Sequence, residues 1–253
     1  MRLMEPDSAS NGDVSEARGI QEKLLRPIPK IRGVEIAKFH RQLLGIGGDF
    51  YDVSDSGHDK LSICIADVRG KGPPAALVMA YLARQLADFG RQDRPPDRFC
   101  QELDKEVRSQ FEGHFWLTAF VCRLDYRKYE MFYTNAGHER PILVPPSGPA
   151  VFLDGGGAPL GMPLDLPMYE QYYVRFGRDY RLLLYTDGVT EAEAATQAES
   201  AEVQHFDVEP LRELAERNRH LGASELMNVI LQRLTEFAAD RFQDDVTLLT
   251  LAT

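Results

Sequence analysis

Four aspartates between residues 49 and 244 stand beside apolar or glycine-rich stretches of this 253-residue chain. Asp67 follows LSICIA, Asp187 follows RLLLYT, and Asp244 precedes VTLLTL, and each of these runs is typical of a buried β-strand. Asp49 follows a Gly-Gly pair. Because an ionised carboxylate is costly to bury without a partner, the pattern predicts that folding brings these groups together around a divalent cation.

The length and composition fit one large domain as well as two small ones, and the charge balance disfavours nucleic acid and anionic membranes as partners. The chain is 43% hydrophobic, and its 39 acidic and 29 basic residues give a net charge of −10 without a long Lys/Arg run. No apolar stretch reaches the roughly 18–20 residues that cross a bilayer, and the N-terminus lacks the apolar core of a signal peptide. Cys64, Cys100 and Cys122 show no metal-binding spacing, which favours buried thiols and a cytoplasmic location.

The N-terminal segment divides into two parts. Residues 1–13 are polar and predicted to be a disordered tail, residues 14–29 a helix and linker, and residues 30–253 the main domain. The apolar residues recur at helical spacing before two prolines, at Val14, Ala17, Ile20, Leu24 and Leu25. This amphipathic helix is either a cap on the core or a dimerisation or regulatory element, because its spacing fits both.

Strands and helices are expected in blocks, which favours an α+β fold with stacked antiparallel sheets. We expect strands at 34–40, 49–53, 61–68, 115–124, 128–135, 141–144, 169–176, 180–186 and 246–251, and helices at 73–89, 96–111, 208–218 and 224–237. Residues 190–209 are acidic and contain no Lys or Arg, which indicates a solvated, mobile flap or a partner-recognition surface.

The candidate ligands are all oxygen atoms. Aspartate carboxylates, with the backbone carbonyl of Val68 as an added donor, favour Mg²⁺ or Mn²⁺ over Zn²⁺. Several aspartates without an obvious side-chain nucleophile suggest two metal ions that activate a water molecule.

Six motifs in this order carry a resemblance to a known family: GIGGDFYDV, ADVRGKGPPAALVMA, YTNAGHERP, GAPLGM, LLLYTDGVTEA and DDVTLLTL. Together they resemble the metal-dependent protein phosphatases (PPM family), in the bacterial SpoIIE-like or RsbU-like branch. The resemblance runs from about residue 20 to residue 251. A GGD sequence also occurs in diguanylate cyclases, but that interpretation leaves the other aspartate motifs unexplained.

The resemblance implies a four-layer αββα sandwich with the metal ions at one edge. By position, Asp67 bridges two Mn²⁺ or Mg²⁺ ions and the Val68 carbonyl completes the coordination of one of them. Asp187 and Asp244 bind the second ion, and Asp49 holds the first directly or through its water ligands. Asp245, beside Asp244, is expected to support the ligands rather than to bind metal.

The implied reaction is hydrolysis of a phosphoserine or phosphothreonine by a metal-bridging water, with Asp67 and Asp187 as the catalytic residues. Eukaryotic members often carry a histidine two residues after the bridging aspartate, where this chain has Arg69. Arginine can bind phosphate but does not act as an acid at neutral pH, so Arg69 and Lys71 are the candidate phosphate-binding residues. His138 is expected to be a buried structural residue.

The resemblance also implies a substrate class: a small phosphorylated signalling protein, such as an STAS-domain anti-sigma-factor antagonist in a partner-switching pathway. The alternative is a pseudo-phosphatase that binds a partner without turnover, although all four metal aspartates are present. The N-terminal helix is a candidate for pairing two copies into a homodimer.

Overall fold

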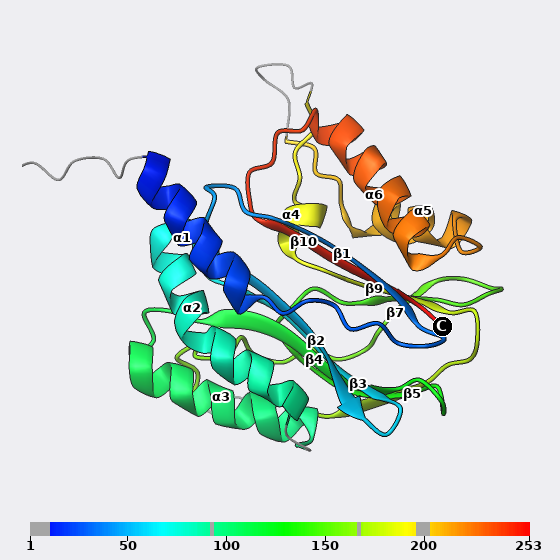
Figure 1. The fold of residues 1–253 in the computed structure, drawn as a ribbon, viewed down its shortest axis with the longest axis horizontal. Helices are drawn as coiled ribbons and strands as arrows, with labels where there is room; N and C mark the ends of the chain where they lie inside the picture. The colour runs from blue at the N-terminus through cyan, green and yellow to red at the C-terminus, as the bar shows by residue number, and fades with distance from the viewer. Residues whose placement is uncertain (1–10, 92–93, 166–167, 196–202) are drawn as a thin grey trace, which may run out of the picture.

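The computed structural model describes residues 11–91, 94–165, 168–195 and 203–253. Two antiparallel sheets are stacked between two layers of helices (Figure 1). The helices are α1 (Asn11–Leu24), α2 (Pro73–Asp88), η1 (Phe89–Arg91), α3 (Pro96–Phe111), α4 (Asp187–Thr190), α5 (Val208–Arg217) and α6 (Ala223–Ala238). The strands are β1 (Glu35–Arg41), β2 (Asp49–Gly57), β3 (Lys60–Val68), β4 (Leu117–Asp125), β5 (Glu130–Ala136), β6 (Ile142–Val144), β7 (Val151–Phe152), β8 (Tyr172–Arg175), β9 (Arg181–Tyr185) and β10 (Val246–Ala252).

Each sheet combines strands from distant parts of the chain. One has the order β2-β3-β4-β5-β8 and is covered by α2 and α3, and the other has the order β1-β10-β9-β6-β7 and is covered by α5 and α6. The predicted αββα sandwich is therefore confirmed.

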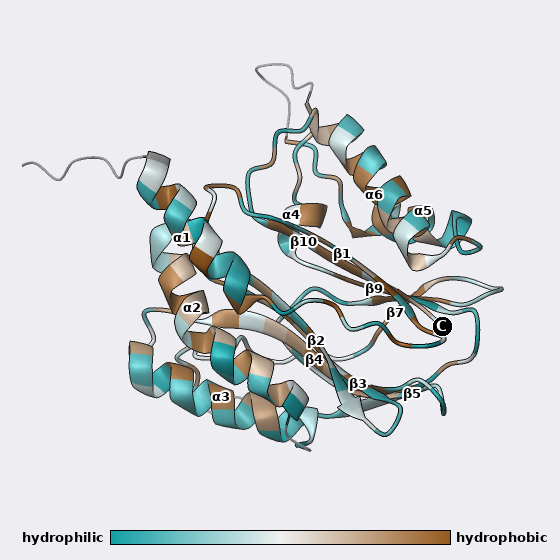
Figure 2. Cartoon of the chain, in the orientation of Figure 1, coloured by the Kyte–Doolittle hydropathy of each residue, from teal (hydrophilic) through white to brown (hydrophobic). Residues whose placement is uncertain are grey.

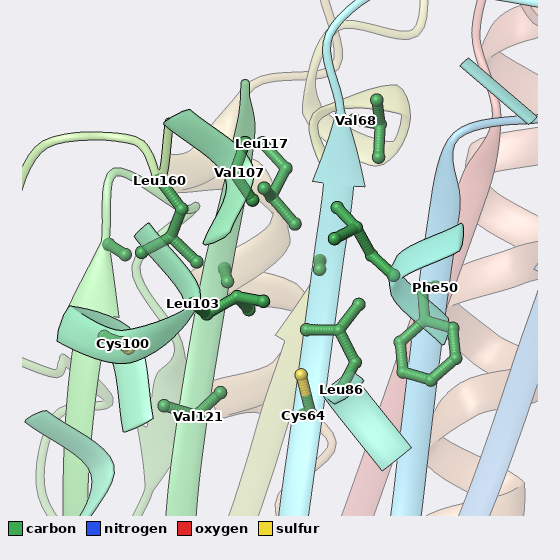
Figure 3. Packing of buried hydrophobic residues seen from close by; sticks show 14 of the residues in the cluster. Phe50, Cys64, Val68, Leu86, Cys100, Leu103, Val107, Leu117, Val121 and Leu160 are labelled. Carbon is green, nitrogen blue, oxygen red and sulfur yellow. The ribbon is translucent and has the colours of Figure 1, made fainter. Parts of the chain in front are cut away.

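Three apolar clusters hold the layers together, and Figure 2 shows hydrophobic residues both along the strands and on the helices that cover them. One cluster lies between α2, α3 and their sheet, where Leu86 and Leu103 meet Cys64 and Val121 (Figure 3). A second fills the space between the two sheets, and the third lies under α5 and α6. All three cysteines are buried and free, as expected, and burial raises the pKa of each thiol.

The N-terminal helix differs from its prediction at its start and in its buried face. The helix begins at Asn11, so residues 11–13 are helical rather than part of a tail, and residues 1–10 lie outside the described part of the chain. Ile20 is 58% exposed, whereas Gln21 is 4% exposed. The face that packs on the domain therefore contains a glutamine, which a search for apolar periodicity passes over.

In its described residues, the acidic segment at 190–209 is not the mobile flap that the sequence predicted. Ala192 and Phe206 are buried, and Phe206 N donates a hydrogen bond to Ala192 O at 2.9 Å. Glu193 and His205 form an antiparallel bridge. The two ends of the segment are therefore paired and packed on the core, while residues 196–202 lie outside the described residues.

Within the described ranges, no helix is both long and apolar enough to cross a membrane.

Candidate metal centre

The β2–β3 pair places two of the four aspartates opposite each other. Asp49 is the first residue of β2 and Asp67 the penultimate residue of β3, and the two are partners in the antiparallel register. Directly opposed residues on antiparallel strands have Cβ atoms roughly 4.5–5.5 Å apart. Asp49 is buried and Asp67 is partly exposed, so Asp67 lies nearer the surface of the site.

The second sheet delivers Asp187 and Asp244 to the same place. Asp187 follows β9 and begins the four-residue helix α4, where the sequence predicted only a turn, and Asp244 lies just before β10. Both carboxylates are partly exposed and lie close enough to Asp67 to raise its pKa through their charge. The edge where both sheets meet thus gathers all four predicted aspartates.

Two threonine hydroxyls join Asp49 to the opposite sheet. The Oγ1 atoms of Thr186 and Thr247 donate to Asp49 Oδ2 at 2.8 and 2.5 Å. Both hydroxyls reach the same oxygen, which leaves Oδ1 of Asp49 as the atom that can face a cation. These threonines were not predicted as site residues, although each stands next to or near a metal-motif aspartate in sequence.

Asp245 binds backbone groups, as expected of a residue that supports the ligands. Its Oδ1 accepts a hydrogen bond from Leu43 N and its Oδ2 one from Gly48 N, both at 2.8 Å. A Cβ atom on Gly47 would lie 1.8 Å from Asp245 Oδ2. A larger residue at Gly47 would therefore displace the Asp245 carboxylate from its hydrogen bonds to the backbone.

Gly48 also lies against the predicted carbonyl ligand. A Cβ atom on Gly48 would lie 2.7 Å from Val68 O, and Val68 N donates to Gly48 O at 3.3 Å. The loop before Asp49 therefore packs against the carbonyl that follows Asp67.

The electrostatics of the site favour a cation. Burial raises the pKa values of Asp49 and Asp67 well above the usual range, and the neighbouring aspartates raise them further. Burial also raises the pKa of Asp187 to about 6, with added repulsion from Glu191 and Asp244. In the described part of the chain, no Lys or Arg forms an ion pair with these three carboxylates. A bound divalent cation would relieve this repulsion.

The donor chemistry fits Mg²⁺ or Mn²⁺, because it consists of carboxylate and backbone oxygens. Among the residues described, no three acidic, histidine or cysteine side chains are positioned to share a single ion. Which of Asp49, Asp67, Asp187, Asp244 and Val68 bind directly therefore stays a prediction.

The two predicted phosphate-binding residues follow Asp67 on an exposed turn but have different contacts. Arg69 N donates to Trp116 O at 3.0 Å, and its guanidinium carbon lies 5.7 Å from the centre of the Trp116 ring. Lys71 Nζ lies 2.7 Å from Asp244 Oδ2. Arg69 is thus supported by an aromatic side chain, whereas Lys71 is engaged with a predicted metal ligand.

His138 has the structural role that the sequence indicated. It is 7% exposed, and its Nδ1 lies 2.8 Å from the hydroxyl of Thr118, the strand partner of Asp67. Burial lowers its pKa to about 3, so the ring is neutral at neutral pH.

The chain is similar in sequence to a known family and to named relatives. A family model described as Stage II sporulation protein E (SpoIIE) matches residues 57–253. Phosphoserine phosphatase RsbU of Bacillus subtilis (strain 168) is 26% identical over 242 residues, which are 94% of this chain and 69% of RsbU. Phosphoserine phosphatase RsbP of the same organism is 30% identical over 206 residues, which are 79% of this chain and 50% of RsbP.

Solved structures share the fold. The SiaA-PP2C domain of Pseudomonas aeruginosa has a TM-score of 0.79 and 18% identity, with 96% of both chains covered. The RsbU and RsbW domains of Rv1364c from Mycobacterium tuberculosis give a TM-score of 0.71 and 23% identity, over 89% of this chain and 61% of that one. The family match covers most of the sequence and includes three of the four aspartates, and the fold agrees with it. The chain belongs to the SpoIIE family, the branch of the PPM (PP2C-type) phosphatases that its motifs predicted.

Proposed function

We propose that this chain is a Mg²⁺- or Mn²⁺-dependent phosphoserine/phosphothreonine protein phosphatase with a binuclear metal centre. The observation that carries the proposal is the gathering of Asp49, Asp67, Asp187 and Asp244 at one edge of two stacked sheets. Asp67 is predicted to hold both ions, Asp187 and Asp244 the second, and Asp49 with the Val68 carbonyl the first.

The protein residues bind and orient, and none supplies a nucleophile. When bound, the two cations supply a nucleophilic water at neutral pH and neutralise charge on the phosphoryl oxygens. Arg69 lies beside Asp67 on the exposed turn, where its guanidinium can bind the phosphoryl group in a bidentate manner. The three thiols are buried with raised pKa values, which argues against a covalent phosphocysteine intermediate.

A phosphate-release assay tests the proposal. The wild-type chain is expected to dephosphorylate a phosphoserine-containing STAS-domain protein with Mn²⁺ and to lose activity with a chelator. Turnover that is unaffected by chelation would contradict the metal mechanism. Inactivity toward every candidate phosphoprotein with Mn²⁺ would instead favour a pseudo-phosphatase that only binds its partner.

The substrate and setting are proposed by analogy with relatives whose names describe phosphoserine phosphatases. We propose a small phosphorylated STAS-domain protein of a partner-switching pathway in the cytoplasm. The chain's acidic character supports a protein rather than a nucleic acid as its partner.

The N-terminal helix is proposed to regulate the site. Gln21 of α1 exchanges two hydrogen bonds with Gly47, donating from Nε2 to the carbonyl at 2.7 Å and accepting from the backbone N at 3.1 Å. Gly47 lies two residues before Asp49 and against Asp245. A movement of α1 would therefore be transmitted to the loop that carries a predicted metal ligand.

Pairing of two copies through α1 would make such a movement depend on dimerisation. Ile20 of α1 is 58% exposed and Leu77 of the adjacent α2 is 72% exposed, so both offer apolar surface to a second copy. A wild-type chain that sediments as a monomer at every concentration would contradict this proposal.

Replacing Gln21 with Ala is expected to raise the Mn²⁺ concentration needed for half-maximal activity severalfold. The change leaves a buried N–H and a buried carbonyl of Gly47 without their partner, which costs about 1–3 kcal/mol. The measurement is a Mn²⁺ titration of phosphatase activity together with a thermal unfolding curve. Gln232→Ala is the matched control, because Gln232 is exposed and the one side-chain hydrogen bond it forms to a described residue goes to Glu236 of α6. Equal Mn²⁺ dependence of Gln21→Ala and wild type would show that α1 does not influence the metal centre.

A further inference from the structure

Lys71 contacts a predicted metal ligand instead of pointing into solvent. Its Nζ lies 2.7 Å from Asp244 Oδ2 and donates a hydrogen bond to Gln243 O at 2.6 Å. Lys71 is therefore a cation held on a carboxylate that the metal is also predicted to use.

The turn that carries Lys71 allows the side chain to leave this position. Lys71 lies between Gly70 and Gly72, whose φ angles are +98° and +68°, in the connection from β3 to α2. Its side chain is 47% exposed and that of Asp244 is 27% exposed. Solvent can therefore replace the ion pair without any change in the packed core.

The Lys71 ammonium gives Asp244 a cationic neighbour that the other three predicted metal aspartates lack among the described residues. Asp49, Asp67 and Asp187 form no ion pair with a Lys or Arg in the described part of the chain, so Asp244 alone has a protein cation beside it. Because two cations held on one carboxylate repel each other at short range, the Lys71 ammonium and a metal ion at Asp244 weaken each other's binding.

We propose that Lys71 is a tethered cation that competes with the divalent metal for Asp244 and so sets the affinity of the Asp187/Asp244 half of the centre. The inference rests on the proposed metal centre. Lys71 is a positioning residue in this role, because it acts through Asp244. When it is displaced from Asp244, its ammonium becomes available to the phosphoryl group of the substrate.

Calorimetric titration of the metal-free protein with Mn²⁺, without substrate, tests the competition. Lys71→Met keeps the apolar length of the side chain and removes the charge. It is expected to bind Mn²⁺ at the Asp187/Asp244 site roughly twofold to fivefold more tightly than wild type, in line with the modest strength of a partly exposed ion pair. Lys71→Arg keeps a cation that can pair with Asp244 and is expected to stay close to wild type.

Lys128→Met is the matched control. Lys128 pairs with Asp125 at 3.8 Å in the turn between β4 and β5, at the end of β4 away from the metal centre. It should leave the Mn²⁺ affinity unchanged. An unchanged or weaker affinity in Lys71→Met would overturn the proposal, and so would an equal gain in Lys71→Arg.

The experiment separates this inference from the proposed phosphatase activity. A tighter Mn²⁺ affinity in Lys71→Met supports the competition even if the wild-type chain hydrolyses no phosphoprotein. An active, Mn²⁺-dependent wild type with identical Mn²⁺ binding in Lys71→Met would retain the proposed function and remove the role of Lys71.

Discussion

Replacing Asp67 with Asn is expected to reduce Mn²⁺-dependent phosphatase activity by about 100-fold or more while the chain stays folded. Changes to groups that merely support a metal ligand typically cost roughly 10–100-fold, and Asp67 is predicted to contact both ions. Asn is nearly the same size as Asp and lacks the negative charge, so the β2–β3 register and the sandwich should persist.

The same substitution should stabilise the metal-free protein. Burial and four neighbouring aspartates disfavour the charged form of Asp67 in the folded state, and Asn removes that repulsion. Thermal unfolding in chelator should therefore show a higher midpoint for Asp67→Asn than for wild type, and Mn²⁺ should stabilise only the wild type. Asp154→Asn, at a side chain that is 90% exposed, is the control. Full activity in Asp67→Asn would contradict the bridging role.

The pH dependence of the stability of the metal-free protein follows from the burial of Asp187 and from its repulsion by neighbouring carboxylates. The pKa of Asp187 is about 6 in the folded chain against an ordinary value of 3.8. Between these values the folded state holds a proton that the unfolded state has lost. Because the unfolded state then binds fewer protons, stability falls as the pH rises through this window and stays lower above it. Asp187→Asn should remove this part of the decline in stability. The measurement is the midpoint of thermal unfolding in chelator, at a series of pH values from 4 to 7.

Replacing Gly188 with Ala is expected to damage both the fold and the site. A Cβ atom on Gly188 would lie 1.9 Å from the backbone oxygen of Asp245, and a backbone atom cannot rotate away as a flexible side chain can. Such overpacking costs typically about 1–3 kcal/mol of unfolding free energy. The clash would push α4 away from Asp245, the residue that precedes β10. This shift should also move Asp187 away from Asp244 and weaken Mn²⁺ binding.

Gly156→Ala provides the matched control for Gly188→Ala, since no heavy atom lies within 4 Å of the added carbon and the φ of Gly156 is not positive. Denaturant unfolding and Mn²⁺ calorimetry on both variants make the comparison. A Gly188→Ala protein with wild-type stability and Mn²⁺ affinity would show that α4 and β10 are not in the close contact that the structure describes.

The stacked sheets and the gathering of the four aspartates at one edge could be predicted from the sequence because each signal is local, and the four-layer order came from the family resemblance. Asp67 and Asp187 end apolar strands, and alternation and turn residues mark those strands without knowledge of their partners. The two-residue strand β7 and the four-residue helix α4 are too short to produce a recognisable period.

The residues that hold the site together could not be predicted in this way, because their roles depend on contacts between distant segments. Thr247 lies 198 positions from Asp49 and Gln21 lies 26 positions from Gly47. A buried glutamine on a short helix carries no sequence signal, and apolar periodicity favoured Ile20 instead, which is exposed. The prediction of a mobile flap at residues 190–209 was wrong at the described ends of the segment for a related reason. The acidic residues indicated solvation, whereas the buried side chains of Ala192 and Phe206 hold the two ends on the core.

The most direct test of the binuclear centre is anomalous diffraction from crystals of the wild-type chain grown with Mn²⁺. Two anomalous peaks are expected at the edge where the sheets meet. Asp67 should contact both, Asp187 and Asp244 one of them, and the Val68 carbonyl with Asp49 or its waters the other. Peaks away from Asp67, or none at saturating Mn²⁺, would contradict the account of the four aspartates as one metal centre.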